Sequence, residues 1–576
     1  MCGIAGIFKP INKVQIDDLR IMSKKIAHRG PDGEGFWINE PGNVGFAHRR
    51  LSIIDLSENA SQPMHYLDRY TIIFNGEIYN YIELKDELIK KGYAFSSSSD
   101  TEVLMALYAE YHTECLSKID GMFAFALFDN VEKTLFLARD RFGEKPLFYT
   151  IQNGSFYFAS EMKALFALGF SRVISTDRMF NFLEYGIVYD DINKDSTFYE
   201  KIHQVPPASF LLLKEGKIIK EKKYWGLDNI QIDNTIKFDD AVEKYRFLLK
   251  ESVNRRLRSD VSVGSSLSGG LDSTAIVLII NSQKQTSQVQ KTFSARFANF
   301  EMDEGKFMEF AIKHGKGIAP EFVWPTADEL LNDLENLIYH QEEPFVSGSM
   351  YAQYKVMQLA KDKGITVLLD GQGADEQLGG YIRYYHHYLS SMLTKQPALF
   401  FQEKTAFNQI NKGLASRYRI PRRLPFWLLK SRILNKPYRY DPDVRSILKE
   451  DTLLNSLNPL LRYGDRNSMA FSREVRLPFL SHELVEFTFS LPTSFLLNKG
   501  WTKFILRKAV EDIIPSEIAW RKDKIGYQPP QDNWDKRIDF LTRDCRQKGY
   551  LQYTDGKKLT STINDWQWLM LKFYAN

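Results

Sequence analysis

The hydrophobic pattern of this 576-residue chain changes character once, and that change sets its fold class. Up to about residue 170, short apolar or alternating runs are separated by Gly, Asn and Asp, as in YTIIFNG, MFAFALF, KTLFLARD and SFYFAS. Helices are expected there at Asp17 to His28 and at Tyr81 to Lys91. Many short strands with few helices predict an α+β domain with stacked antiparallel sheets.

From about residue 237, strands alternate with helices. An amphipathic helix is expected near Ala241 to Arg258, and the strands VSVGSSL, KTFSARF and GITVLLD alternate with helices that begin near Ser273, residue 304 and Ser349. This alternation predicts an α/β domain with a parallel sheet, whose ligands lie at the carboxyl ends of the strands. A Pro206-Pro207 break and the polar stretch LDNIQIDNTIK separate the two patterns. We expect a first domain over residues 1–215, a linker over 216–236 and a second domain over 237–576.

Charge and cysteine content exclude several classes of protein. The 76 Lys and Arg and 72 Asp and Glu leave a net charge of +4, too weak for nucleic acid or an anionic membrane to be the main partner. Three widely spaced cysteines favour neither a disulfide framework nor a CxxC metal site. The amino terminus lacks the features of a signal peptide, and the apolar runs are shorter than the ~18 residues of a membrane span. We expect a cytoplasmic protein that acts on small molecules.

Cys2 is the first candidate for catalysis. The initiator methionine is usually removed before a small residue, and Cys2 would then carry a thiol and a free α-amine together. An α-amine has a pKa of about 7.7 to 8 and a thiol about 8.5, so the amine can accept the thiol proton near neutral pH. Such a pair is suited to attack on an amide carbonyl. A lone cysteine at position two is more often a small apolar residue at a frayed end, so its context decides.

That context is a set of segments, CGIAGIF, AHRGPDGEG, HRRLSIIDL, FNGEIYN and SDTEV. Together they resemble the glutamine amidotransferase domain of the N-terminal-nucleophile hydrolases over nearly all of the first 200 residues. The resemblance implies that Cys2 is the nucleophile, and that Asn75 and the backbone N–H of Gly76 form the oxyanion hole. Two aimed donors of this kind each lower the barrier by ~3 kcal/mol.

The same resemblance implies the residues that bind glutamine. Arg50 would bind the α-carboxylate, a task suited to a bidentate guanidinium, and Glu77 and Asp100 would contact the amino end. Taken singly, each of the three would more often be a surface or ion-pair residue, and Asn-Gly would be a common turn. Their joint occurrence in order favours the site. The remaining glutamine-binding residues that the resemblance implies are Leu51, Ser52, Ile53 and Ile54.

SGGLDS, residues Ser268 to Ser273, follows the strand VSVGSSL and precedes an apolar helical run. Its glycines admit an anion to backbone N–H groups, its serines add hydroxyl donors, and the helix N-terminus favours negative charge. No GxxxxGK[ST] is present, so this is not a Walker A loop. The motif resembles the pyrophosphate loop of ATP pyrophosphatases. That resemblance makes Asp272 a candidate Mg²⁺ ligand, although a helix cap would fit the position equally well.

A third motif, GQGADEQLGGY, follows the strand GITVLLD. Its adjacent carboxylates, Asp375 and Glu376, stand at a helix start, where they could simply complement the helix dipole. The resemblance instead pairs Asp375 with Asp272 around Mg²⁺ and places Gln372, Asp375 and Glu376 near the acyl-adenylate. The ATP-binding residues that it implies are Ser266, Ser268, Gly269, Gly270, Leu271, Asp272, Ser273, Ala295, Asp370, Gly371 and Lys524.

Two basic segments complete the second half. Lys524 in IAWRKDKIGYQPP best matches a residue that faces the departing phosphates, with Lys522 as the weaker alternative and a solvated lysine as the ordinary one. The basic and aromatic stretch 417–440 could contact a partner, but a surface helix pair is about three times as common.

Both halves together resemble the glutamine-hydrolysing asparagine synthetases across essentially the full chain, in the same order. The resemblance implies an N-terminal-nucleophile fold followed by an ATP-pyrophosphatase fold, with ATP and Mg²⁺ as cofactors, ammonia passing internally between two sites, and a homodimer as one option. It implies that glutamine is hydrolysed to ammonia, and that the aspartate β-carboxylate is adenylated and then amidated with release of AMP and PPi. A glutamine-binding protein without turnover is the rival, which a glutaminase assay would distinguish.

Gln372 and Asp370 leave the acceptor open. Better-studied asparagine synthetases have glutamate and serine at these two positions, and glutamine cannot act as a general base. We therefore rank aspartate first and keep another carboxylate, such as a sugar uronic acid or a peptide or small-molecule acid, as the alternative.

Overall fold

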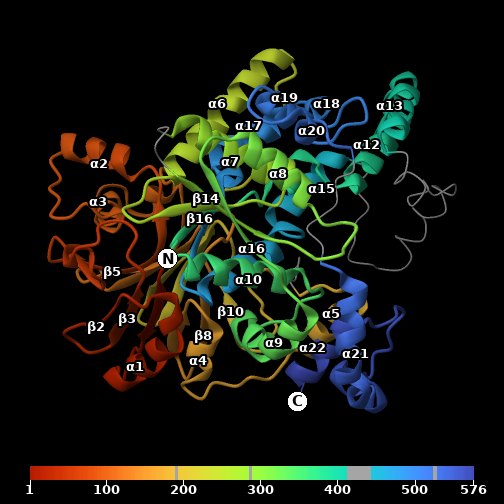
Figure 1. The fold of residues 1–576 in the computed structure, drawn as a ribbon. Helices are drawn as coiled ribbons and strands as arrows, with labels where there is room; N and C mark the ends of the chain where they lie inside the picture. The colour runs from red at the N-terminus through yellow and green to blue at the C-terminus, as the bar shows by residue number, and fades with distance from the viewer. Residues whose placement is uncertain (189–192, 285–288, 412–442, 523–528, 576) are drawn as a thin grey trace.

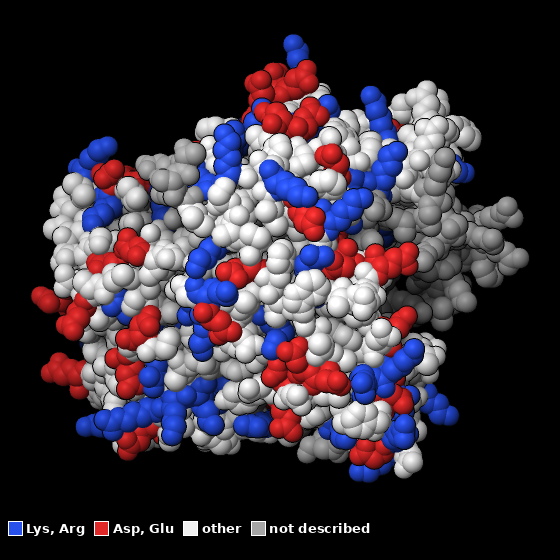
Figure 2. Space-filling model, in the orientation of Figure 1, with Lys and Arg blue, Asp and Glu red and all other residues white. Residues whose placement is uncertain are grey.

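The computed structural model describes residues 1–188, 193–284, 289–411, 443–522 and 529–575. Two predictions fall outside these ranges, the phosphate-facing Lys524 and the stretch 417–440. Within the ranges, no helix combines the length and the apolar composition that crossing a bilayer requires. Basic and acidic side chains are interspersed over the face shown in Figure 2.

The first half forms two six-stranded antiparallel sheets that pack face to face (Figure 1). Ile4 and Phe8 of one sheet share a buried cluster with Phe128 and Leu137 of the other. The predicted α+β class is confirmed. The first sheet has the order β10 (His203–Gln204), β8 (Phe148–Gln152), β9 (Ser155–Ala159), β1 (Gly3–Phe8), β3 (Val44–Arg50), β2 (Gly33–Ile38), and the second β12 (Lys217–Lys223), β11 (Ser209–Lys214), β7 (Thr134–Arg139), β6 (Gly121–Asp129), β5 (Tyr70–Ile78), β4 (Met64–Tyr66).

Helices cover the two outer faces of this sandwich. Leu19 of α1 (Ile16–Lys25) packs on the first sheet, with α4 (Met162–Phe166) beside it. On the second sheet lie α2 (Tyr81–Lys90) and α3 (Asp100–Tyr111). The sequence analysis did not predict α3, because its residues are buried from Asp100 to Tyr108 and it therefore lacks a polar stripe.

The second half contains a five-stranded parallel sheet, which confirms the α/β prediction. Its strand order is β15 (Ile318–Val323), β14 (Gln290–Ala295), β13 (Val263–Ser266), β16 (Val367–Leu369), β17 (Glu474–Arg476). The main helices are α6 (Phe238–Arg256), α7 (Leu271–Gln283), α8 (Gly305–His314), α9 (Ala327–Gln341), α10 (Ser349–Asp362), α11 (Ala374–Leu378), α12 (Ile382–Lys395), α13 (Pro397–Ile410), α15 (Val444–Leu453), α16 (Leu457–Met469), α17 (His482–Ser490) and α19 (Phe504–Val510).

The two halves contact each other at places other than the segment that connects them. Strand β12 lies inside the expected linker but pairs with β11, so residues 224–236 are what remains as a connection. At the other end of the chain, α21 (Gln531–Lys548) and α22 (Asp565–Ala575) lie near α5 (Thr176–Tyr185) of the first half (Figure 1). Gln567 of α22 donates from Nε2 to the carbonyl oxygens of Phe182 and Leu183 at 2.8 and 2.9 Å. The domain boundaries themselves stay a prediction.

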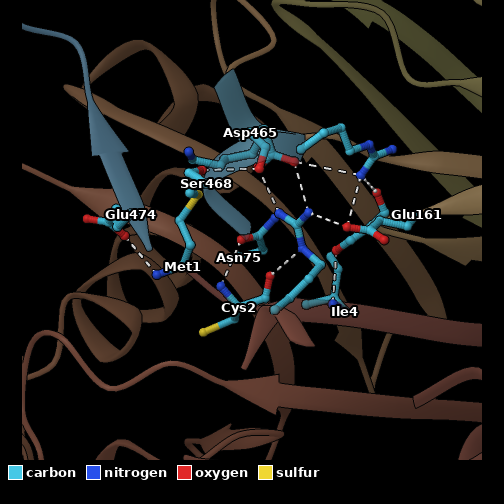
Figure 3. Close-up of polar contacts among 12 residues, drawn as sticks. Met1, Cys2, Ile4, Asn75, Glu161, Asp465, Ser468 and Glu474 are labelled. Atoms are coloured by element: carbon cyan, nitrogen blue, oxygen red, sulfur yellow. Dashed lines mark hydrogen bonds and ion pairs between the residues drawn. The ribbon is translucent and has the colours of Figure 1, made fainter. Parts of the chain in front are cut away.

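Buried ion pairs cross the same interface. Arg29 is fully buried, and its guanidinium donates to both carboxylate oxygens of Asp465 at 2.8 Å and to Glu161 Oε1 at 2.7 Å (Figure 3). Arg466 of the second half pairs with Glu161 of the first half at 3.2 Å. Because a buried charge without its partner destabilises by ~3–5 kcal/mol, these pairs strongly disfavour separation of the halves.

Candidate active sites

Cys2 precedes β1 directly and faces β5 of the opposite sheet. Its backbone N–H donates to Asn75 Oδ1 at 2.9 Å (Figure 3). Its Sγ lies 4.0 Å from the carbonyl oxygen of Leu51. Asn75 Nδ2 is buried and has no partner among the described residues, so one donor is free there. Gly76 must be glycine, because a Cβ would lie 2.1 Å from the carbonyl oxygen of Met122. The structure thus brings the predicted nucleophile together with Asn75 and Gly76.

A small cavity of about 30 Å³ collects the predicted glutamine-binding residues. The Arg50 guanidinium donates to the carbonyl oxygens of Ser57, at 2.8 Å, and of Asp55. Met1 also lines the cavity, so removal of Met1 enlarges it. The predicted residues in the lining are Cys2, Arg50, Leu51, Ser52, Ile53, Ile54, Gly76, Glu77 and Asp100.

Two buried carboxyl groups give the cavity its electrostatic character. Burial raises the pKa of Glu77 well above its ordinary value, and the charges of Glu474 and Asp100 add to the rise. Glu77 Oε2 has no hydrogen-bond partner among the described residues. Burial also raises the pKa of Asp100, to about 6. A bound cation would lower both pKa values, because it stabilises the charged carboxylates.

Met1 is present in this structure, which therefore shows the chain before its first residue is removed. Its α-amine donates to Glu474 Oε2 at 2.7 Å, and both groups are buried (Figure 3). The nitrogen of Cys2 is an amide in this state and cannot act as a base. Burial raises the pKa of the Cys2 thiol, and the positive N-terminus opposes that rise. The thiol is therefore protonated while Met1 remains.

In the second half, the SGGLDS loop joins β13 to α7 as the sequence predicts. Gly269 has a φ of +77°, and a Cβ there would lie 3.0 Å from Phe307 Cβ, so this position favours glycine. The hydroxyl oxygens of Ser268 and Ser273 lie 3.0 Å apart across the loop. This arrangement at the start of a helix is suited to bind an anion.

The GQGADE segment meets the SGGLDS loop. A Cβ on Gly371 would lie 2.9 Å from the backbone nitrogen of Ser273, so only glycine permits this approach. Together the two segments border a pocket of about 420 Å³. The predicted residues that line it are Ser266, Ser268, Gly270, Asp272, Ser273, Asp370, Gly371, Gln372, Asp375 and Glu376.

Lys503, just before α19, joins the two predicted metal ligands. Its buried Nζ lies 2.5 Å from Asp272 Oδ2 and 2.6 Å from Asp375 Oδ1. Asp272 Oδ1 is buried and has no partner among the described residues. Two carboxylates thus converge on one cation, although the described ranges contain no group of three or more His, Cys, Asp or Glu that could hold a metal.

Gln372 and Glu376 occupy different surroundings in the pocket. Gln372 Oε1 faces α16, where it lies 3.5 Å from the position that a Cβ on Gly464 would take. Glu376 is buried, and its Oε1 accepts hydrogen bonds from the Tyr381 hydroxyl at 2.9 Å and from Ser456 Oγ at 3.1 Å.

Four predicted nucleotide residues are not placed in the lining of the pocket. Gly269 belongs to the SGGLDS loop but is not a lining residue. Leu271 is buried in the core cluster, and Ala295 is buried at the end of β14. Lys524 lies outside the described residues, and its alternative, Lys522, is exposed. Conversely, sequence reasoning missed Lys503, since the segment TKFILRKA carries no pattern that separates a site lysine from a surface lysine.

The strand β17 lies between the two cavities and was also missed. Arg476 donates from Nε to Glu474 Oε1 at 2.6 Å, and its Nη2 lies 3.7 Å from Glu77 Oε1. Its carbonyl oxygen accepts from the backbone N–H of Asp370 at 3.0 Å. A single residue of the second half therefore contacts the small cavity through its side chain and the large pocket through its backbone.

Comparison with known proteins accounts for both halves. Residues 1–225 match a family model described as a glutamine amidotransferase domain, and residues 244–567 match one described as asparagine synthase. Asparagine synthetase [glutamine-hydrolyzing] 1 of Bacillus subtilis is 34% identical over 93% of this chain and 88% of its own length. Asparagine synthetase [glutamine-hydrolyzing] 3 of the same organism is 31% identical over 91% of this chain and 86% of its own. The chain therefore belongs to the asparagine synthase family, with a glutamine amidotransferase domain at its amino terminus.

Proposed function

We propose that the protein is a ligase that makes asparagine from aspartate, with glutamine as the nitrogen donor and ATP as the energy source. The observation that carries this proposal is the presence on one chain of a Cys2–Asn75 pair at one cavity and of two converging motif loops at another. Two relatives with this domain order are named as glutamine-hydrolysing asparagine synthetases. The test is asparagine and PPi formation from aspartate, MgATP and glutamine by the purified protein.

Glutamine hydrolysis would begin once Met1 is removed. The α-amine of Cys2 takes the thiol proton, Sγ attacks the glutamine δ-carbonyl, and the oxyanion accepts hydrogen bonds from Asn75 Nδ2 and the N–H of Gly76. The unpartnered Nδ2 supports this role. The amine then returns the proton to the departing nitrogen, so that ammonia leaves and a thioester remains for water to hydrolyse.

Glutamine recognition would use both ends of the amino acid. Arg50 is free to exchange its backbone carbonyl contacts for the α-carboxylate, which pairs with a guanidinium bidentately. Glu77 and Asp100 would bind the α-ammonium, because both are buried carboxyls beside the same cavity and Glu77 Oε2 lacks a partner among the described residues.

Glutamine affinity should therefore fall in acid. The pKa of Asp100 is raised to about 6, so this carboxyl is neutral below that pH and cannot pair with the α-ammonium. We expect the Kd for glutamine to rise by up to about tenfold per pH unit below pH 6 and to level off above it. Calorimetry on a Cys2→Ala variant measures binding without turnover. An Asp100→Asn variant should bind weakly at every pH, and a wild-type Kd that is flat from pH 5 to 7 would contradict this role.

The synthetase reaction would occupy the large pocket. An aspartate β-carboxylate oxygen attacks the α-phosphorus of ATP, and PPi leaves across the SGGLDS loop. Ammonia then displaces AMP from the acyl carbon, and its excess proton passes to the departing AMP phosphate. Asp272 and Asp375 fit Mg²⁺, because they already converge on a cation and Asp272 Oδ1 has no partner among the described residues. When bound, the metal would neutralise phosphate charge. Lys503 would remain as the neighbouring cation.

Gln372 tests the choice of acceptor. If aspartate is the acceptor, Gln372 orients substrate by hydrogen bonds, and Gln372→Glu should leave ammonia-dependent synthesis within about tenfold, or ~1.4 kcal/mol. If Gln372 instead accommodates another acid, a new carboxylate would repel it and lower turnover by several orders of magnitude. PPi release with aspartate and with a panel of uronic acids decides. Turnover of another acid without turnover of aspartate would overturn the proposal.

The proposal extends to the setting of the enzyme. Cys2, Cys115 and Cys545 are all unbridged, which suits the reducing cytoplasm. We propose that its substrates are small molecules, that it binds no nucleic acid, and that it forms a homodimer, which analytical ultracentrifugation would detect.

A further inference from the structure

A third cavity lies between the two halves, away from both candidate active sites. Its volume is about 50 Å³, and within the described ranges it shares no lining residue with the small cavity or the large pocket. A single water needs roughly 10–15 Å³, so the cavity has room for a group of several heavy atoms. The first half contributes Arg139 and Phe148 to the lining, and the second half contributes Arg462 and Arg466.

The α16 helix supplies one wall of this cavity. Asn458, Arg462 and Arg466 follow one another at intervals of four residues, so they lie on one face of the helix. Asn458 is the second residue of α16, where backbone N–H groups lack intrahelical acceptors and attract negative charge. This wall therefore combines two guanidinium groups with the positive end of a helix.

Arg139 brings a buried charge to the cavity from the first half. Its guanidinium donates to neutral acceptors at 2.7 to 3.0 Å, which are the carbonyl oxygens of Gly143, Lys145 and Val205 and the side-chain oxygen of Gln204. The adjacent Asp140 carboxylate accepts instead from the backbone N–H groups of residues 142–145. Burial lowers the pKa of Arg139 to about 10. An anion beside Arg139 would stabilise its charged form.

Arg466 adds a hydrogen-bond donor that is not used within the described residues. It is 1% exposed, its Nη2 donates to Glu342 Oε2 at 2.7 Å, and its Nη1 lies 3.2 Å from Glu161 Oε1. Its Nε has no acceptor among the described residues. Because a buried N–H without an acceptor is unfavourable, an oxygen atom in the cavity would satisfy a donor that is already in place.

The carboxyl groups in the lining do not compensate Arg139. Glu343 Oε2 accepts from Arg462 at 2.6 Å. Both oxygens of Asp465 accept from Arg29 at 2.8 Å. Burial raises the pKa of Glu144 to about 8, so this carboxyl is neutral at pH 7. The cavity therefore has an excess of positive charge.

We propose that this cavity binds a small oxyanion of the phosphate class between Arg139 of the first half and Arg466 and the amino end of α16 of the second. The oxyanion provides a charge partner for Arg139 and an acceptor for Arg466 Nε. The cavity is too small for a whole nucleotide, so the ligand is free phosphate or the phosphate group of a nucleotide whose remainder lies outside. Because the contacts come from both halves, binding stabilises their docking. This site is separate from the proposed synthesis, and its test requires no turnover.

The test is Asn458→Asp in the full-length protein, with bound phosphate measured by equilibrium dialysis against radiolabelled inorganic phosphate. Aspartate in the first turn of a helix is favourable, so the variant should fold, but its carboxylate repels an anion in the cavity. We expect phosphate bound per chain to fall by one, with at least tenfold weaker binding at this site. Any phosphate on the SGGLDS loop is common to both proteins. Asn455→Asp is the matched control, because it adds the same charge three residues earlier, outside the lining.

A variant of opposite charge keeps the test decisive if Asn458→Asp is unstable. Asn458→Lys should bind cavity phosphate at least threefold more tightly than the wild type. Competition by AMP for the cavity phosphate would identify a nucleotide's phosphate group as the ligand, and its absence would identify free phosphate; either result supports the site. Equal binding by the wild type, Asn458→Asp and Asn458→Lys would overturn the proposal, and so would an equal loss in Asn455→Asp.

Discussion

Replacing Cys2 by alanine is expected to lower glutaminase activity and glutamine-dependent synthesis by at least about 10⁴-fold, while ammonia-dependent synthesis persists. The nucleophile is lost outright, and in enzymes that act through a covalent intermediate this is the most costly single deletion. The large pocket lies in the other half of the chain, and among the described residues it shares no lining residue with the small cavity. Added ammonium supplies the nitrogen that Cys2 no longer releases.

The measurement is glutamate, asparagine and PPi formation with glutamine and, separately, with ammonium chloride. Cys115→Ala is the matched control, because Cys115 is the other cysteine of the first half and lies in the core under the second sheet. It should retain glutaminase activity. Loss of both activities in a folded Cys2→Ala protein would refute the assignment of two separate sites.

The second large effect is expected for Asp272→Asn. This change removes one of the two proposed metal ligands. It also removes the charge of one of the two carboxylates that pair with the buried Lys503 ammonium, and of these two only the Asp375 carboxylate remains. Because an anionic ligand is lost from the metal that would neutralise phosphate charge, PPi release should fall by about 10²–10³-fold, which corresponds to ~3–4 kcal/mol of barrier. Glutaminase activity should survive, since Cys2 and Asn75 are untouched.

Asp303→Asn is a matched control for that experiment. Asp303 pairs with Arg296 at 2.8 Å and lies outside the pocket lining. The variant should release PPi at a rate within a few-fold of wild type. Normal PPi release by Asp272→Asn would make its carboxylate a helix cap without a role in catalysis.

What the sequence predicts correctly is local in the chain. The strand runs before residue 170 and the strand–helix alternation after 237 are confirmed as two antiparallel sheets and one parallel sheet. Most of the motif residues also lie at the two cavities, and the glycines at positions 76, 269 and 371 permit the close approach of the backbone that brings them there. Their catalytic roles remain proposals.

What the sequence does not show depends on contacts between distant segments. Lys503 reaches Asp272 across 231 residues, and Glu474 reaches Met1 across 473. No periodicity or spacing encodes such a pair. The strand β17 has three residues, and α3 is buried through most of its length, so neither has the alternation by which strands and helices are recognised.

The distance in sequence between Met1 and Glu474 also has a consequence for biosynthesis. Translation at about 5–20 residues per second needs roughly 25 to 95 s to proceed from the first residue to the 474th. Throughout that interval the α-amine lacks the carboxylate that later covers it, and an aminopeptidase at the ribosome has access to Met1. After folding, Met1 is 1% exposed. The order of synthesis thus allows methionine removal before the interface closes, and a chain that escapes it would fold with its nucleophile blocked.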